Sequence, residues 1–112
     1  MRIIATASVL VGLVLFGQAA NAAELTLEQK SIYPGEFAPN LLIVKKGVPV
    51  KLLVTTKVRE HVNRISILPW IPRSGRLSPG KTTVVEFTPD QTGDFEIRNI
   101  GHGFTATLRV VE

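Results

Sequence analysis

The chain has 112 residues, 45% of them hydrophobic, and a formal net charge of +4, a composition typical of one small globular domain. It contains no cysteine and a single methionine, Met1, so disulfide bridges, a thiolate nucleophile and a metal site with a cysteine ligand are excluded. The basic residues form no long run, which favours mildly acidic partners over nucleic acid.

The N-terminal residues predict a secretory signal peptide. Arg2 gives a positive start, residues 3–16 form an apolar run, and the sequence Ala-Asn-Ala at 20–22 fits the small-x-small rule for cleavage. The apolar run is shorter than the roughly 20 residues that a membrane-spanning helix needs. We therefore expect a signal peptide over residues 1–22, export to the periplasm, and a mature protein over residues 23–112 without a membrane anchor.

The mature chain is predicted to be all-β. Hydrophobic and polar residues alternate with the period of two expected of half-buried strands, and turns rich in Gly and Pro separate the strands. The expected strands lie near residues 23–29, 41–45, 48–55, 62–68, 83–87, 95–99 and 106–110. The segment 69–76 is expected to be irregular because two prolines and a glycine interrupt it. Short strands at this spacing predict an antiparallel sandwich with Greek-key connections.

The segment 93–110 carries the most informative local pattern. Apolar and polar residues alternate along its first strand, and this parity directs Asn99 toward the core. Gly101 and Gly103 then flank His102, so the backbone can turn sharply and present the imidazole at the end of the sheet. A histidine in such a position can bind a ligand.

Several motifs together resemble those of small bacterial periplasmic cupredoxin-like domains. The resemblance covers residues 36–112 and includes the segments IVKKGVPVKLLV and LSPGKTTVVEFTPDQTGDFEI, followed by GHGF near the C-terminus. It implies a cupredoxin-like, antiparallel Greek-key β-sandwich over residues 23–112. It also implies a function in binding a transition metal.

The resemblance further implies where a metal would bind. Copper-carrying members have two histidine ligands, a cysteine and usually a methionine, and His61 and His102 match the two histidines. Asn99 stands at the cysteine position, and Ala106 or Thr107 stands at the methionine position. Because the intense blue chromophore needs a copper–thiolate bond, we predict that type 1 blue-copper chemistry is absent.

Without sulfur, the donors that remain suit borderline or hard metal ions. His61, His102 and the oxygen of Asn99, with Glu60 or water, can hold Cu(II), Zn(II) or Ni(II), and copper is the expected cofactor because Cu(II) generally binds best. The alternative is that His61 caps a strand while His102 is an exposed loop residue, so that no metal binds.

A second candidate feature is the loop around Trp70. Trp70 lies between two prolines with Arg73 and Arg76 nearby, a combination that can form a docking patch because Trp and Arg dominate interface energies. The interpretation that we favour is that Trp70 closes one end of the sandwich and the arginines are solvated, since a large aromatic residue in a small domain usually packs.

No catalytic constellation is found, so we predict that the protein is not an enzyme. There are only two histidines, and no glycine-rich phosphate loop or zinc-protease motif is present. The expected partner is a periplasmic redox or metal-transport protein. Two alternatives stay open, a metal-free interaction module and an accessory of periplasmic iron or copper uptake, in which Glu60 would provide a harder ligand for iron.

Overall fold

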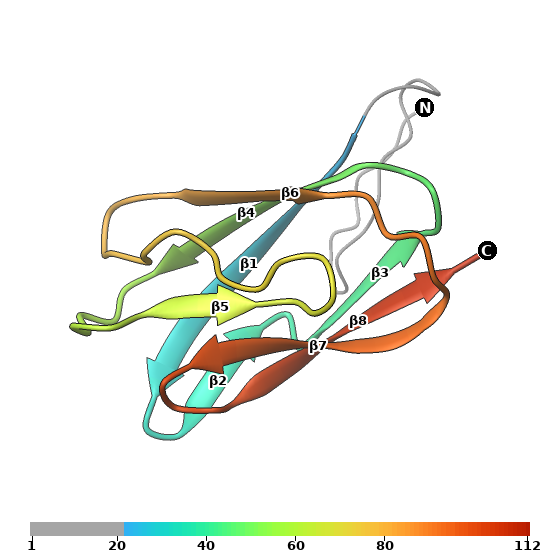
Figure 1. Cartoon of the computed structure of the whole chain (residues 1–112). Coiled ribbons are helices and arrows are strands. Elements are labelled where there is room, and N and C mark those ends of the chain that lie inside the picture. Colours follow the sequence, from blue (N-terminus) through green and yellow to red (C-terminus); the bar gives the residue numbers. More distant parts are fainter. Residues whose placement is uncertain (1–21) are drawn as a thin grey trace.

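The computed structural model describes residues 22–112, so the predicted signal peptide lies outside the described residues except for its last position. The described residues form eight strands and no helix (Figure 1). The strands are β1 (Ala23–Ile32), β2 (Gly35–Ala38), β3 (Leu41–Lys45), β4 (Val50–Thr56), β5 (Arg64–Ser66), β6 (Thr83–Phe87), β7 (Gly93–Ile100) and β8 (Thr105–Val111). Within this range, no helix that could span a membrane is found.

Two four-stranded sheets make up the sandwich. One has the strand order β2-β1-β4-β6 and the other the order β3-β8-β7-β5 (Figure 1). Four of the pairings are antiparallel, whereas β1 pairs with β4 and β3 pairs with β8 in parallel. The predicted all-β sandwich is confirmed, but its sheets are mixed and not antiparallel throughout. Parallel neighbours need a crossover connection, which a local hydrophobic pattern does not reveal.

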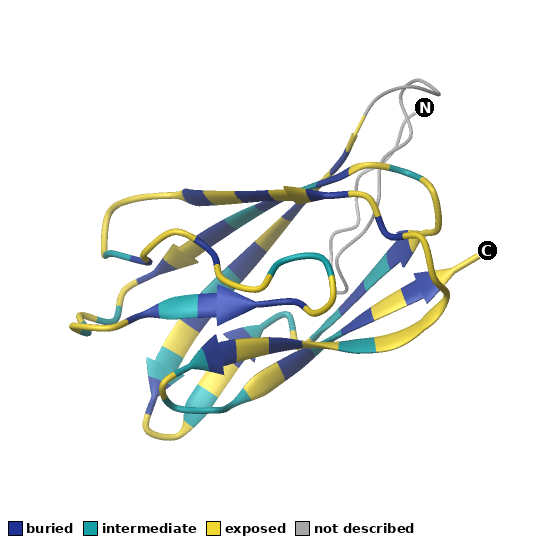
Figure 2. Cartoon of the chain, viewed as in Figure 1, coloured by how far each residue is buried: buried dark blue, intermediate teal, exposed yellow. Residues whose placement is uncertain are grey.

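The core lies between the two sheets and follows the predicted alternation. Buried positions alternate with exposed or partly exposed positions along β4, β6 and β8, as the banded ribbons show (Figure 2). The largest fully buried apolar side chains are Leu27, Leu42, Leu52, Ile65, Ile67, Leu77, Ile97 and Leu108. Burial of this apolar surface is the main favourable term in the free energy of folding.

Strand β1 pairs with two strands, and Gln29 lies where its pairing changes from one to the other. Residues 23–29 of β1 pair with β4, while residues 28–32 pair with β2 after a shift of register between Gln29 and Ser31. Gln29 therefore lies where both partners meet, and it is fully buried. This irregularity also lets β1 continue three residues beyond its predicted end.

Most predicted strands are confirmed, with two differences. Strand β2 was not predicted, because it begins at the glycine of a predicted Pro-Gly turn and its four residues are too few to show a period. Strand β5 is shorter than the predicted 62–68, and only an isolated bridge from Ile67 to Ile71 continues it. The segment 69–76 is irregular, as its prolines predicted.

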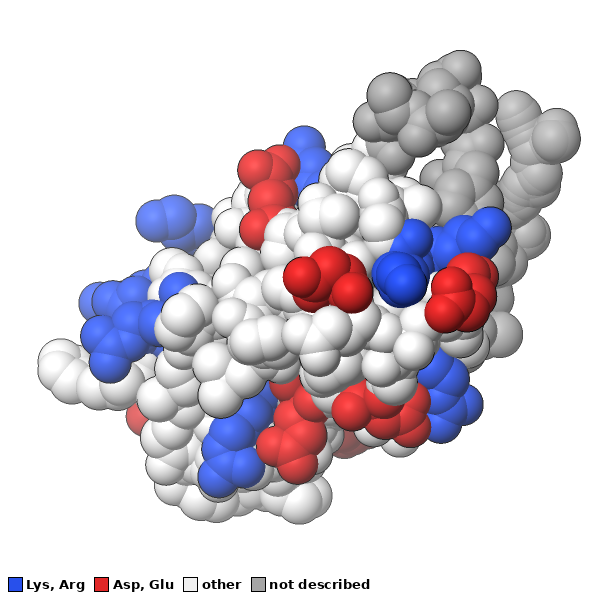
Figure 3. Space-filling view, turned by 45° about the vertical axis from the view of Figure 1, so that its right-hand side comes forward, with Lys and Arg blue, Asp and Glu red and all other residues white. Residues whose placement is uncertain are grey.

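Charged side chains of both signs are distributed over the surface. Figure 3 shows small groups of Lys and Arg separated by groups of Asp and Glu and by uncharged surface on the visible face. One cross-strand pair is well formed, since Arg109 Nε donates to Asp94 Oδ1 at 2.8 Å and Nη2 donates to Oδ2 at 3.0 Å. These hydrogen bonds lower the pKa of Asp94 below its usual value.

Candidate functional site

The loop between β7 and β8 presents His102 at one end of the sandwich. Gly101 and Gly103 have φ angles of 113° and 83°, a region that disfavours residues with a side chain. Two backbone hydrogen bonds close the loop, from Asn99 N to Phe104 O and from Gly103 N to Asn99 O, both at 2.9 Å. The predicted glycine-flanked presentation of His102 is confirmed.

Asn99 lies directly behind this loop and is fully buried, as its parity predicted. Its Oδ1 accepts a hydrogen bond from the backbone N–H of His102 at 3.0 Å. Its Nδ2 donates to Gln29 Oε1 at 2.7 Å and to Asn63 Oδ1 at 3.0 Å. Asn99 therefore uses both amide hydrogens inside the protein, and its oxygen supports the backbone of His102.

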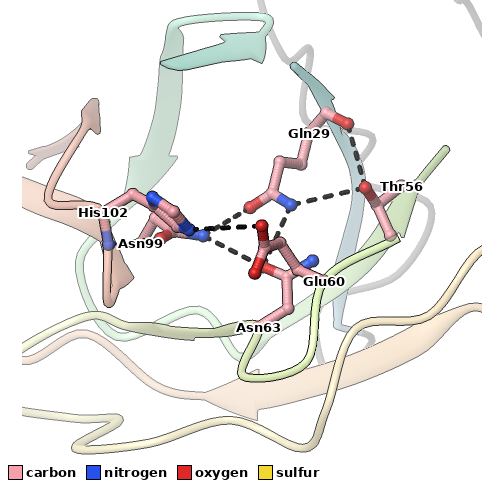
Figure 4. A network of polar contacts seen from close by, with 6 residues as sticks. All are labelled: Gln29, Thr56, Glu60, Asn63, Asn99 and His102. Atoms are coloured by element: carbon pink, nitrogen blue, oxygen red, sulfur yellow. Dashed lines mark hydrogen bonds and ion pairs between the residues drawn. The ribbon is translucent and has the colours of Figure 1, made fainter. Parts of the chain in front are cut away.

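Three further polar residues complete a buried cluster, which we call the amide network. Its members are Gln29, Thr56, Asn63 and Asn99, and all four are buried (Figure 4). Gln29 Nε2 donates to Asn63 Oδ1 at 3.0 Å and to Thr56 Oγ1 at 3.3 Å, and Thr56 Oγ1 donates to the carbonyl of Gln29 at 3.2 Å. The network joins β1 and β4 of one sheet to β7 of the other.

The orientation of Asn63 follows from its neighbours. Its Oδ1 accepts from the amide nitrogens of both Gln29 and Asn99, so exchanging its oxygen and nitrogen would bring donors against donors. This orientation leaves Asn63 Nδ2 as the one buried side-chain polar atom of the described residues without a hydrogen-bond partner. The other side-chain polar atoms of the amide network all form hydrogen bonds, either to one another or to backbone groups.

Next to the amide network, the imidazole of His102 lies close to the carboxylate of Glu60. Its Nε2 lies 3.7 Å from Glu60 Oε2, and the two side chains are 21% and 31% exposed (Figure 4). The ring of Tyr33 packs edge-on against the imidazole with centroids 5.5 Å apart. His61 follows Glu60 in the chain and is exposed. We call Glu60, His61 and His102, with Tyr33 beside them, the rim site.

The structure brings together three of the four predicted metal-site residues. Asn99 bonds the backbone of His102, and His102 pairs with Glu60. Residues 22–112 contain no group of three or more His, Cys, Asp or Glu side chains placed to hold one ion. The predicted sharing of one metal by His61 and His102 stays a prediction.

Sequence reasoning missed Gln29 and Asn63, although a signal for both was present. Gln29 continues the inward alternation of Leu25 and Leu27, and Asn63 has the same parity as Ile65. A polar residue at an inward position needs a buried hydrogen-bond partner. Pairing the inward polar positions with one another would have identified the network.

Trp70 packs against the core beside β6 and β7. Its ring stacks on Phe87 with centroids 5.7 Å apart and meets Phe95 edge-on at 4.6 Å. Its Nε1 donates to Asp90 Oδ1 at 2.9 Å. These contacts agree with the packing role that we favoured from the sequence. Arg73 and Arg76 are exposed, and the docking role of this loop stays a prediction.

Gly35, the first residue of β2, tests how this strand packs against the loop that carries His102. A Cβ at Gly35 would overlap the ring of Phe104, the residue that ends the His102 loop. Phe104 is itself packed on Phe37, with centroids 4.9 Å apart, so the ring has little room to move. We expect Gly35→Ala to lower the free energy of unfolding by about 1–3 kcal/mol, measured by urea denaturation. Gly75→Ala is the matched control, since a Cβ there meets only Thr83 Cγ2 at 3.6 Å, and an equal loss in both variants would contradict this packing.

Comparison with known proteins identifies the fold. No family model and no curated protein matches the sequence. Among solved structures, a copper binding protein in the apo form is 21% identical with a TM-score of 0.70, covering 91% of this chain and 96% of its own. The metal binding domain of the Cu(I) exporting P-type ATPase CopA of Streptococcus pneumoniae D39 is 16% identical with a TM-score of 0.67, covering 91% and 94%. Auracyanin A, a "blue" copper protein of Chloroflexus aurantiacus, is 16% identical with a TM-score of 0.61, covering 81% and 100%. The chain therefore has the cupredoxin-like fold.

Proposed function

We propose that this protein is an exported cupredoxin-like domain that binds a divalent transition metal, most readily Cu(II), at the rim site. In this proposal His102 and Glu60 are ligands, and His61 is the third. Asn99 supports His102 from the interior through its backbone N–H. The proposed role is to carry metal to, or receive it from, a periplasmic redox or metal-transport protein.

The observation that carries the proposal is the distance of 3.7 Å between His102 Nε2 and Glu60 Oε2. Metal bonds to imidazole nitrogen and carboxylate oxygen are about 2.0–2.2 Å long, so one ion can bridge two atoms at this separation. Imidazole with carboxylate is a donor set that suits Cu(II). Both side chains are partly exposed, so water can reach the ion. His61 would have to move toward it to become the third ligand, since no three His, Cys, Asp or Glu side chains of residues 22–112 are placed to hold one ion.

Two further observations are consistent with this assignment. The solved structures of similar fold include a copper binding protein and the metal binding domain of a Cu(I) exporting ATPase. The sequence has no cysteine, so a thiolate cannot be among the ligands. Any copper at the rim site would therefore lack type 1 blue-copper chemistry.

Titration with Cu(II) tests the proposal. We expect the protein to bind one Cu(II) per chain, with weak d–d absorption and no intense thiolate charge-transfer band. His102→Ala and Glu60→Gln are each expected to weaken binding at least about tenfold, because each removes one ligand from a small set. Glu86→Gln, which changes an exposed carboxylate on β6, is the control and should bind as the parent does. Unchanged affinity in His102→Ala and in His61→Ala would refute the proposal.

The start of β1 supports export with cleavage after Ala22. Ala23 is buried, donates its backbone N–H to Pro49 O at 2.7 Å and pairs with Val50, so it belongs to the sheet, as expected of the first residue of the proposed mature chain. We expect the intact mass of the protein from the periplasmic fraction to correspond to residues 23–112. A mass that retains residues 1–22, found in a membrane fraction, would contradict this expectation.

The second candidate function is a metal-free interaction module. Tyr33 is 81% exposed and Val62 is 53% exposed, and both lie at the end of the sandwich that presents His102. Exposed aromatic and apolar side chains beside a half-buried histidine favour contact with another protein. A third role, as an accessory of iron uptake, draws support from Glu60, since a carboxylate makes the donor set harder. Preference for Fe(II) over Cu(II) in a competition titration would select this role, and failure to bind either ion would select the interaction module.

A further inference from the structure

The two loops that form the rim site come from different parts of the sandwich. Residues 57–63 connect β4 of one sheet to β5 of the other, and residues 101–104 connect β7 to β8. Figure 1 shows both loops at the same end of the molecule. The first loop carries Glu60 and His61, and the second carries His102. The geometry of the rim site therefore depends on how the two loops are held relative to each other.

Each loop is anchored to the amide network. Thr56 Oγ1 accepts the backbone N–H of Val58 at 2.9 Å, and Asn63 ends the first loop inside the network. Asn99 Oδ1 accepts the N–H of His102 in the second loop. Gln29 on β1 bonds Thr56, Asn63 and Asn99, and so it links the anchors of both loops although it belongs to neither.

We infer that the amide network is a positioning device that sets the separation of His102 from Glu60 and thereby the metal affinity of the rim site. This inference rests on the proposed function for its ligand and on the observed hydrogen bonds for its mechanism. None of Gln29, Thr56, Asn63 and Asn99 is a metal ligand in the proposed function, so they are positioning residues. Metal sites require ligands held within about 0.5 Å of their productive geometry, and hydrogen-bonded supporting residues provide this precision.

Burial makes the device stiff. All four side chains are shielded from water, so a bond lost inside the network cannot be replaced by a bond to solvent. The network is also shared, since Asn63 Oδ1 accepts from two donors and Gln29 Nε2 serves two acceptors. Movement of one loop therefore disturbs the hydrogen bonds that hold the other.

The test uses Gln29→Met, which keeps the side-chain length but removes every side-chain hydrogen bond of Gln29. In the metal-free protein we expect amide exchange at His102 to become at least about tenfold faster, and Cu(II) affinity to fall about 10–100-fold. Thr56→Val is the second variant, nearly the same in shape and expected to fold even if Gln29→Met does not. It removes the acceptor for Gln29 and Val58 and should change both quantities in the same direction.

Val44→Ala is the control for stability alone. Val44 is buried in β3 and belongs to neither loop nor to the network, so its loss lowers global stability without altering the anchors. It should leave Cu(II) affinity and the relative exchange of the His102 amide unchanged. If both network variants keep the parental affinity and the parental exchange at His102, the inference is wrong. If the parent binds no Cu(II) but amide exchange at His102 is still faster in the network variants, the proposed function fails. The role of the amide network in positioning the His102 loop would then stand.

Discussion

Replacing Ile97 by alanine is expected to lower the free energy of unfolding by about 2–5 kcal/mol, the largest loss foreseen for a purely apolar substitution. Ile97 is fully buried in β7, which pairs with β5 on one side and β8 on the other. Alanine leaves a cavity between the sheets, and a strand held on both sides has little freedom to collapse into it.

The magnitude matters because small domains have only about 5–15 kcal/mol of total stability. Urea denaturation followed by far-ultraviolet circular dichroism measures the change, with a lower midpoint at an unchanged slope. Val84→Ala is the control, since Val84 is 48% exposed on the edge strand β6 and its loss should cost within about 0.5 kcal/mol. Equal midpoints for the two variants would contradict the prediction that Ile97 contributes strongly to the stability of the core.

The period of two predicted the faces of the strands well, because burial of one face is a local property of the sequence. It placed Ile97 and Asn99 inward on β7, and both are fully buried. Pairing between strands is not local. The parallel pairing of β1 with β4 joins Ala23 to Val50, although β2 and β3, which belong to different sheets, lie between them in the chain. The local pattern of neither strand indicates which strand it pairs with.

The same division applies to the candidate site. Asn99 and His102 were found because they lie in one segment, three positions apart in the sequence. The partners of Asn99 are 70 and 36 residues away, at Gln29 and Asn63, so only the folded topology brings them together. His61 shares the parity of Asn63 but is exposed, because it lies in a loop where the alternation of a strand no longer applies.

Replacing Asn99 by aspartate is expected to destabilise the protein strongly. The substitution exchanges Nδ2, which donates to Gln29 Oε1 and Asn63 Oδ1, for an oxygen that faces the same two acceptors. It also places a negative charge in a fully buried position. An uncompensated buried charge costs about 3–5 kcal/mol, so at pH 7 the free energy of unfolding should fall by that amount.

The pH dependence identifies the cause of this loss. Burial and the two facing oxygens both disfavour the charged form, so the pKa of the introduced carboxyl group in the folded state lies above its unfolded value of about 3.9. Between these two pKa values the folded state binds more protons than the unfolded state, and stability relative to the parent falls as the pH rises. The loss should therefore be smallest below about pH 4 and should reach its full size once the pH exceeds the folded pKa.

Asn40→Asp is the matched control, because Asn40 is exposed and the introduced charge stays in water. Its effect on stability should be small and should show no comparable dependence on pH. Urea denaturation of the parent and both variants at pH 4 and pH 7 provides the comparison. A loss in Asn99→Asp that is equal at the two pH values would mean that broken hydrogen bonds alone, and not a buried charge, account for it. No loss at either pH would show that the amide network does not hold the two sheets together at the end that presents His102.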